Sequence, residues 1–357
     1  MAETTGPHRA VAGPEARERF AADLLDRLWW RYRERVGYVQ VYERLIAASG
    51  GSFTNDHIAL RTLASQIPFT GIATLGRIFE ALGWRAAGVY QFPDKALNAQ
   101  HFEHPNPAFP KIFISELQTW TLSASLRETL AKSVRTHRLP VSDETLALVA
   151  QLDLDSGVHA SAGARVSEHA GGKPASSFGA DANASSDAGV GANGKGIDER
   201  RRAALLDRLV REFHELPWNL PERSDVERAN RESQYAAWVL LHGYNVNHFT
   251  ALINSQGVPA LSSIEATAAA LAAAGVPMKA EIEGAPGSKL RQTATAAATV
   301  QAAVAVQGMQ AEMAWSYAYF ELAERGDTVD PESGERRRFE GFLGPQATQL
   351  FDMTKRS

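Results

Sequence analysis

Two segments of this chain share one layout, and each opens on a predicted strand that carries a histidine. The strand, helix and strand are predicted at 56–63, 74–84 and 85–92 in the first segment, and at 247–254, 263–275 and 276–284 in the second. From His57 to Gly83 is 26 residues, and from His248 to Gly275 is 27. Two segments of nearly equal length, each beginning with a histidine and with a glycine after its predicted helix, predict duplicated modules. The two modules would direct two potential metal ligands at one centre.

Composition narrows the classes of protein that are open to the chain. Its 357 residues are 44% hydrophobic, which is enough for a compact globular protein. The formal charge of −4 and the pI near 6.2 argue against nucleic acid or an anionic membrane as a partner. The absence of cysteine excludes thiolate metal sites, disulfides and cysteine nucleophiles, so histidines and carboxylates must hold any metal.

Targeting signals are not evident. The first twenty residues contain no apolar run of signal-peptide length, and the alanine-rich runs at 267–274 and 294–305 are too short to span a membrane. We therefore expect a cytoplasmic protein, with a small molecule rather than a membrane as its partner. The sequence does not specify an oligomeric state.

Periodicity places further elements around the two modules. Helices are predicted within 15–49 and at 122–137, 142–153, 198–214 and 225–241, and strands at 111–117, 288–295 and 316–325. Between them, 25 of the 40 residues from 156 to 195 are Gly, Ala or Ser, a composition that cannot supply a core. The expected organisation is a disordered tail at 1–14, a first module with helices at 15–155, a disordered insertion at 156–197 and a second module with helices at 198–357. The two modules together form one compact catalytic domain.

Alternation along the predicted strands separates polar from apolar faces. The polar faces carry His57 and Arg61 on the first strand, His248, Thr250 and Asn254 on the second, and Tyr317, Tyr319, Glu321 and Arg325 on the last. Their opposite faces are mainly apolar, as expected for strands covered by helices. The polar faces are therefore the candidate site.

Two imidazoles and one carboxylate would leave open positions on a bound metal, as in non-haem Fe(II) oxygenases. Arg61 lies two residues beyond Ala59 on the His57 face, about 6–7 Å along the strand, where a guanidinium can bind a substrate carboxylate. The same residues allow a structural interpretation. A strand histidine is often only a hydrogen-bonded residue, and Arg61 could instead be the buried ion-pair partner of Glu321.

Other histidines are weaker candidates. His101 and His104 flank Glu103 in a proline-rich stretch that we expect to be a loop. His214 opens a zincin-like pattern that Pro217 and Trp218 interrupt. We expect His242 at a helix end, where a cation would be favoured, and four more in solvated tails, helix ends or the insertion: His8, His137, His159 and His169.

Three motifs resemble a known family. DHIALR at 56–61, GYNVNHFT at 243–250 and YFELAERG at 319–326 are similar to the DUF1338 family of 2-oxoadipate dioxygenase/decarboxylases, within the vicinal-oxygen-chelate-like metalloenzymes. The resemblance covers roughly 15–155 and 198–355. It implies an α+β fold in which two βαβ-type modules form a curved open sheet around one metal, wrapped by helices.

The same resemblance implies a reaction and a set of site residues. His57, His248 and Glu321 correspond to Fe(II) ligands, His57 and His248 also face the substrate, and Arg61 binds its carboxylate as the catalytic positioning group. The family converts 2-oxoadipate and O₂ to 2-hydroxyglutarate and CO₂ in lysine breakdown. Longer members have a further C-terminal part that touches substrate, whereas this chain stops 36 residues after Glu321, so the length of the accepted acid is left open.

Two other functions are compatible with the residues themselves. Imidazole and carboxylate also suit Mn²⁺, Zn²⁺ or Ni²⁺, so a non-redox isomerase or lyase of the same superfamily is an alternative. A metal-free small-molecule binding module is the other. Metal analysis of protein purified without oxygen would separate the three.

Overall fold

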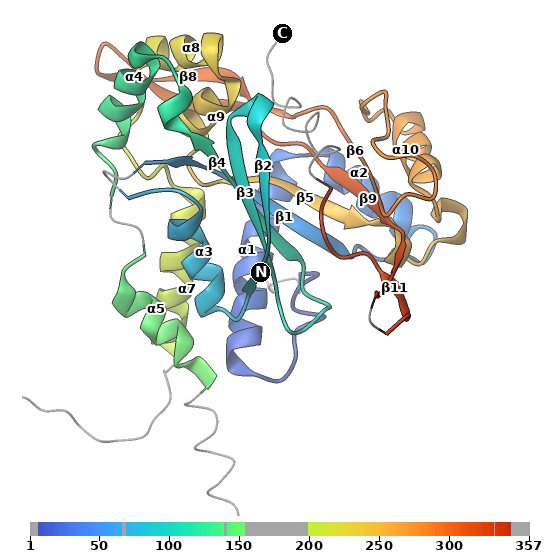
Figure 1. Cartoon of the computed structure of the whole chain (residues 1–357). Helices are drawn as coiled ribbons and strands as arrows, with labels where there is room; N and C mark the ends of the chain where they lie inside the picture. Colours follow the sequence, from blue (N-terminus) through green and yellow to red (C-terminus); the bar gives the residue numbers. More distant parts are fainter. Residues whose placement is uncertain (1–5, 66–68, 139–140, 154–198, 332, 344–357) are drawn as a thin grey trace, which may run out of the picture.

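The computed structural model describes residues 6–65, 69–138, 141–153, 199–331 and 333–343 (Figure 1). The helices are α1 (Ala16–Arg35), α2 (Tyr38–Ala47), α3 (Ile72–Ala81), α4 (Ala124–Val134), α5 (Asp143–Ala150), α7 (Glu199–His214), α8 (Arg223–Glu232), α9 (Gln234–His242) and α10 (Ile264–Ala273). The strands are β1 (Asn55–Ala64), β2 (Arg85–Phe92), β3 (Leu97–Glu103), β4 (Lys111–Gln118), β5 (Val246–Leu252), β6 (Leu290–Ala294), β7 (Thr299–Val306), β8 (Met309–Ser316), β9 (Glu321–Arg325), β10 (Asp327–Val329) and β11 (Arg336–Arg338).

A seven-stranded curved sheet unites the two modules, in the order β2-β3-β4-β1-β5-β9-β6. β1 and β5 pair antiparallel at its centre, and each has a parallel neighbour on its outer side: β4 beside β1, and β9 beside β5. The next strands, β3 and β6, are antiparallel to those neighbours. The repeated pairing confirms the predicted duplication, with the module junction at the β1–β5 pair.

Each module contains more than the strand, helix and strand that the sequence indicates. After α3 the first module adds the β2–β3 hairpin and then β4, which is the strand that pairs with β1. In the second module the predicted strand at 276–284 is wrong. Pro277 lacks an amide hydrogen, and this segment forms only isolated bridges, at Glu283 with Gln292 on β6 and at Met278 with Thr295 directly after β6.

One helix covers the outer part of each module, as Figure 1 shows at the two ends of the sheet. α3 packs against β2, β3 and β4, and α10 packs against β6 and β9. These helices are followed by Gly83 and Gly275, whose φ angles are 110° and 84°. Only glycine adopts such angles without a steric penalty, which explains why both modules end their helix on this residue.

The apolar side of the central strands forms the core with α1. The Phe249 ring lies 5.0 Å from the Trp29 ring and 4.9 Å from the Tyr32 ring, measured between centroids. Ile58 and Leu60 are buried in the same core. The predicted apolar faces of β1 and β5 are therefore turned to the helices, which leaves the opposite face for the site.

Several predicted boundaries need correction. The helix predicted at 225–241 is two helices, because Ser233 has extended angles and its hydroxyl caps α9 by accepting from the Ala236 amide. The last strand begins at Glu321 rather than at 316. Residues 299–316 instead form the β7–β8 hairpin, whose turn places both Gln307 and Gly308 at positive φ.

The N-terminal residues also depart from expectation. His8, predicted to be solvated, is buried: its Nδ1 lies 2.8 Å from Asp26 Oδ1 and its Nε2 lies 2.9 Å from Asn55 Nδ2. Residues 6–14 are thereby attached to α1 and β1. The insertion predicted at 156–197 lies outside the described residues, as do His159 and His169. Among the helices described, none is long and apolar enough to cross a membrane.

Candidate metal centre

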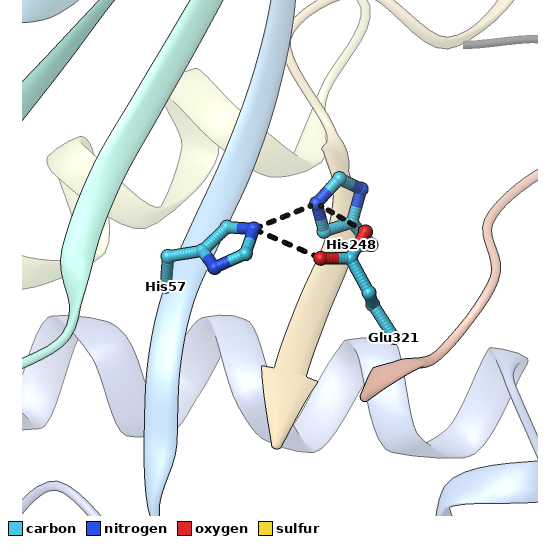
Figure 2. Close-up of side chains that lie close together, drawn as sticks. All are labelled: His57, His248 and Glu321. Carbon is cyan, nitrogen blue, oxygen red and sulfur yellow. Dashed lines mark hydrogen bonds and ion pairs between the residues drawn. The ribbon is translucent and has the colours of Figure 1, made fainter. Parts of the chain in front are cut away.

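Three neighbouring strands bring His57, His248 and Glu321 together (Figure 2). In the sheet register His248 on β5 pairs with Ala59 on β1, two residues beyond His57. Glu321, the first residue of β9, pairs with Thr250 on β5. All three side chains project from the polar face of the sheet, as alternation predicts.

The potential ligand atoms of the three residues lie close together. His57 Nε2 is 3.2 Å from His248 Nε2 and 3.3 Å from Glu321 Oε1, and His248 Nε2 is 3.5 Å from Glu321 Oε2. All three side chains are almost fully buried. Ligands of one first-row metal at about 2.0–2.2 Å stand roughly 3–4 Å apart, so this spacing suits a single ion.

A neighbouring amide orients His248. Its Nδ1 lies 3.2 Å from Asn247 Oδ1, and because that oxygen can only accept, Nδ1 carries the proton. Nε2 then carries a lone pair and faces His57 and Glu321. An outer hydrogen bond of this kind is typical of metal-bound histidines.

Only one carboxylate oxygen of Glu321 accepts hydrogen bonds from the described residues. Its Oε1 accepts from Gln292 Nε2 at 2.7 Å and from the Thr250 hydroxyl at 3.4 Å. Its buried Oε2 has no hydrogen-bond partner among the residues that the structure describes. An unsatisfied buried carboxylate oxygen is costly, and a cation between Oε2 and the two imidazoles would remove that cost.

The charges of the cluster also suit a cation. Burial lowers the pKa of His248 to about 3, which keeps this imidazole neutral. Burial raises the pKa of Glu321, but the two histidines and the Gln292 amide outweigh it and lower the pKa, so the carboxylate stays ionised. For His57, burial lowers the pKa, but Asp56 and Glu321 together raise it above the usual value. A metal would therefore compete with a proton for His57 on binding.

Arg61 lines the same cavity as the three residues. Its side chain is buried, and its guanidinium carbon lies 5.0 Å from the Tyr235 ring and 5.3 Å from the Trp238 ring, both on α9. The Tyr235 hydroxyl is in turn fixed by the Ser115 carbonyl at 2.8 Å. Arg61 is thus a buried cation beside the cluster, held by stacking on two anchored rings.

The competing histidines lie outside the cluster. His101 is in β3, not in a loop as predicted, and its ring contacts Tyr90 and Glu103. His242 does end α9, but burial lowers its pKa to about 3 and its Nε2 donates to the Ser316 carbonyl, so it is not the cation expected there. His137, predicted to be solvated, is hydrogen-bonded to the Tyr244 hydroxyl at 2.9 Å.

Sequence reasoning missed several residues of the cavity wall: Leu60, Phe113, Ser115, Asn247, Gln292 and Phe342. Asn247 could have been identified from the sequence because it directly precedes His248. Gln292 is buried on β6, where a polar side chain needs a partner, and this could have indicated it. Phe342 belongs to the segment after β11, and nothing in its sequence context points to the site.

Comparison with known proteins identifies the family. A model described as 2-oxoadipate dioxygenase/decarboxylase matches residues 42–177 and 181–352, most of the chain. The chain belongs to this family. The 2-oxoadipate dioxygenase/decarboxylase (chloroplastic/amyloplastic) of Oryza sativa is 24% identical over 373 residues, covering 99% of this chain and 84% of the relative. The chloroplastic enzyme of the same name from Arabidopsis thaliana is 24% identical over 319 residues, covering 84% and 67%.

Solved structures of similar proteins share the fold. Hydroxyglutarate synthase of Oryza sativa, in complex with 2-oxoadipate, aligns with a TM-score of 0.67 at 23% identity, covering 99% of this chain and 98% of that chain. A putative glyoxalase superfamily protein from Ralstonia eutropha JMP134 aligns with a TM-score of 0.70 at 23% identity, covering 92% and 87%. Both likenesses bear out the predicted vicinal-oxygen-chelate-like sheet.

Proposed function

We propose that the protein is an Fe(II)-dependent dioxygenase/decarboxylase that converts 2-oxoadipate and O₂ to 2-hydroxyglutarate and CO₂, a step of lysine breakdown. The observation that carries the proposal is the buried cluster of His57, His248 and Glu321, with one unsatisfied carboxylate oxygen, in a chain of the 2-oxoadipate dioxygenase/decarboxylase family. The relatives named for this reaction support the choice of substrate.

In this proposal His57 Nε2, His248 Nε2 and Glu321 hold the iron, and the two histidines also face the bound acid. A ferrous ion held by these residues would supply open positions for the acid and O₂ and a redox-active centre at which O₂ can react. The protein residues around the ion keep its ligands in the required states. Asn247 fixes the tautomer of His248, and Gln292 holds Glu321 in its orientation.

Arg61 is the proposed anchor for a substrate carboxylate. A guanidinium binds a carboxylate through two parallel hydrogen bonds, which fix orientation as well as position. Its stacking on Tyr235 and Trp238 restricts its movement before the substrate arrives. Arg61 would thus orient the acid relative to the cluster.

The atoms of the reaction balance without another reactant. The bond between C1 and C2 of the keto acid breaks, and C1 leaves as CO₂. C2 becomes a carboxylate with one oxygen atom from O₂, and the adjacent carbon takes the other as a hydroxyl group. The keto acid supplies all the electrons that O₂ takes up.

The test is turnover by protein prepared without oxygen and loaded with Fe(II). With 2-oxoadipate, we expect O₂ consumption and CO₂ release in equal amounts and accumulation of 2-hydroxyglutarate. Oxygen uptake only with a different 2-oxo acid would keep the chemistry and refute the substrate. No uptake with any 2-oxo acid, at full iron occupancy, would refute the dioxygenase and favour the isomerase or lyase alternative.

A further inference from the structure

The cavity beside the metal cluster contains about 400 Å³ of space between the protein atoms, part of it open to solvent. A space of this size can hold a small 2-oxo acid, so the residues of the cavity wall determine which acid fits.

Phe342 lines the cavity from outside the strands of the main sheet. The other lining side chains belong to β1, β4, β5, β6 and β9 or, for Tyr319, to the residues leading into β9. Phe342 reaches the cavity from the segment that follows the β10–β11 hairpin. It is 8% exposed, so its ring is inserted into the protein rather than lying on the surface.

The ring fills the space between the cluster and the first half of the sheet. Its centroid lies 4.9 Å from the His57 ring, 4.9 Å from Phe113 on β4 and 5.2 Å from His101 on β3. The Tyr90 ring on β2 is 6.1 Å away. An acid bound at the cluster and extending toward β2–β4 would meet this ring first.

The backbone of the segment is firmly attached. Arg325 Nη1 donates to the carbonyl oxygens of Phe339 and Gly341 at 3.0 and 2.9 Å, and the Phe342 amide donates to the Tyr90 hydroxyl at 3.2 Å. Arg325 is itself fixed by Asp56, with Nε 2.7 Å from each carboxylate oxygen. These hydrogen bonds keep the Phe342 ring near the cluster.

A buried cation also contacts the ring. The guanidinium carbon of Arg325 is 5.3 Å from the Phe342 ring centroid. Its buried Nη2 has no hydrogen-bond partner among the described residues. Removal of the ring would open a path from the metal cluster toward a donor that suits the distal carboxylate of a long dicarboxylic acid.

We propose that Phe342 sets the length of the 2-oxo acid that the site accepts. The inference rests on the proposed function. The anchored backbone holds the ring beside the cluster, so acids up to 2-oxoadipate fit and longer ones meet the ring. Without the ring, the space lined by Tyr90, His101 and Phe113 becomes available, and Arg325 can pair with the far carboxylate.

The test is anaerobic calorimetry of acid binding to iron-loaded protein, because it does not depend on turnover. The acids are 2-oxoglutarate, 2-oxoadipate, 2-oxopimelate and 2-oxosuberate. For the wild type we expect 2-oxoadipate to bind more tightly than the two longer acids. Phe342→Ala should shift the ratio of Kd values toward 2-oxosuberate by at least about tenfold, the scale of discrimination that added methylenes produce. A monocarboxylic 2-oxo acid of the same length should gain less, because it cannot pair with Arg325.

Phe339→Ala is the matched control, since this ring belongs to the same segment, lies over Lys289 and does not line the cavity. It should keep the wild-type ratio. Phe342→Leu should shift the ratio in the same direction by less, and it serves if the alanine variant fails to fold. An unchanged ratio in a folded Phe342 variant, or an equal shift in Phe339→Ala, would overturn the inference alone. If no 2-oxo acid binds even the wild type at full iron occupancy, the proposed function fails and this inference with it.

Discussion

At the scale of single residues, the sequence predicts the cluster because duplication gives its two histidines corresponding places. His57 and His248 open the two central strands, and alternation places Arg61 on the same face. Gln292 and Phe342 could not be predicted in the same way. Each reaches the cavity from an element that the sequence does not link to the histidines, and only the folded sheet brings them together.

Gln292→Leu tests the orientation of Glu321. The change removes the 2.7 Å hydrogen bond to Oε1 while a side chain of similar size remains. We expect iron affinity to fall roughly 10–100-fold, the usual effect of losing a hydrogen-bond partner of a metal ligand. Anaerobic competition with a chelator measures it. Gln118→Leu removes a comparable bond, to Asn98 far from the cluster, and should leave the affinity unchanged. Equal affinities in wild type and Gln292→Leu would refute the role.

Arg61→Lys tests the substrate anchor. Lysine keeps the charge but loses the planar fork and the stacking on Tyr235 and Trp238. Loss of a charge-assisted hydrogen bond costs about 1.5–3 kcal/mol, so KM for the acid should rise roughly 10–100-fold with iron content unchanged. Steady-state kinetics measures KM, and iron analysis measures the metal content of the variant. Loss of iron or of folding, with normal acid binding by the surviving protein, would make Arg61 structural.

At the scale of elements, the sequence predicts a helix end correctly where one residue must adopt a particular backbone angle. The helix of each module is followed by a glycine, Gly83 or Gly275, because a positive φ is needed at that position. The segment 276–284 has a strand-like pattern, but Pro277 at the edge of the sheet limits it to isolated bridges. The β7–β8 hairpin was missed because Gln307 is an unusual residue for a turn position with positive φ.

A buried ion pair joins two of these elements and can be tested directly. Arg325 at the end of β9 pairs with Asp56 on β1, and both side chains are almost fully buried. Asp56→Asn leaves the guanidinium without its counter-ion, so the free energy of unfolding should fall by about 3–5 kcal/mol. Urea denaturation of the metal-free protein measures it. Asp327→Asn breaks the exposed pair with Arg336 and should cost less than about 1 kcal/mol. Similar losses in both variants would contradict the account.

At the scale of the whole molecule, two modules form one sheet, and the site lies where they meet. Neither module holds the cluster alone: β1 supplies His57, while β5 and β9 supply His248 and Glu321. The sequence predicts this arrangement through its repeat. It does not predict how far the chain after Arg325 returns to cover the cavity, because that path depends on Asp56, Tyr90 and Lys111 in the other module.

The stability of the whole molecule should depend on pH through Glu212 on α7. Burial raises the pKa of this carboxyl to about 7, from 4.5. As pH rises between these values, the unfolded chain loses its proton while the folded protein keeps it. Stability should therefore fall from about pH 4.5 to 7 and level off above that. Glu212→Gln should remove this part of the decline and raise the melting temperature at pH 8. An unchanged slope in the variant would show that Glu212 titrates normally.

The central claim is that both atoms of O₂ enter the shortened acid at the site of His57, His248 and Glu321. The most direct measurement is mass spectrometry of the product after single turnover of the iron-loaded protein with 2-oxoadipate under ¹⁸O₂. We predict 2-hydroxyglutarate with one labelled atom in the new carboxylate and one in the hydroxyl group, and unlabelled CO₂. Glu321→Gln should give no labelled product. Label in the carboxylate alone, with unhydroxylated glutarate as the product, would contradict the account.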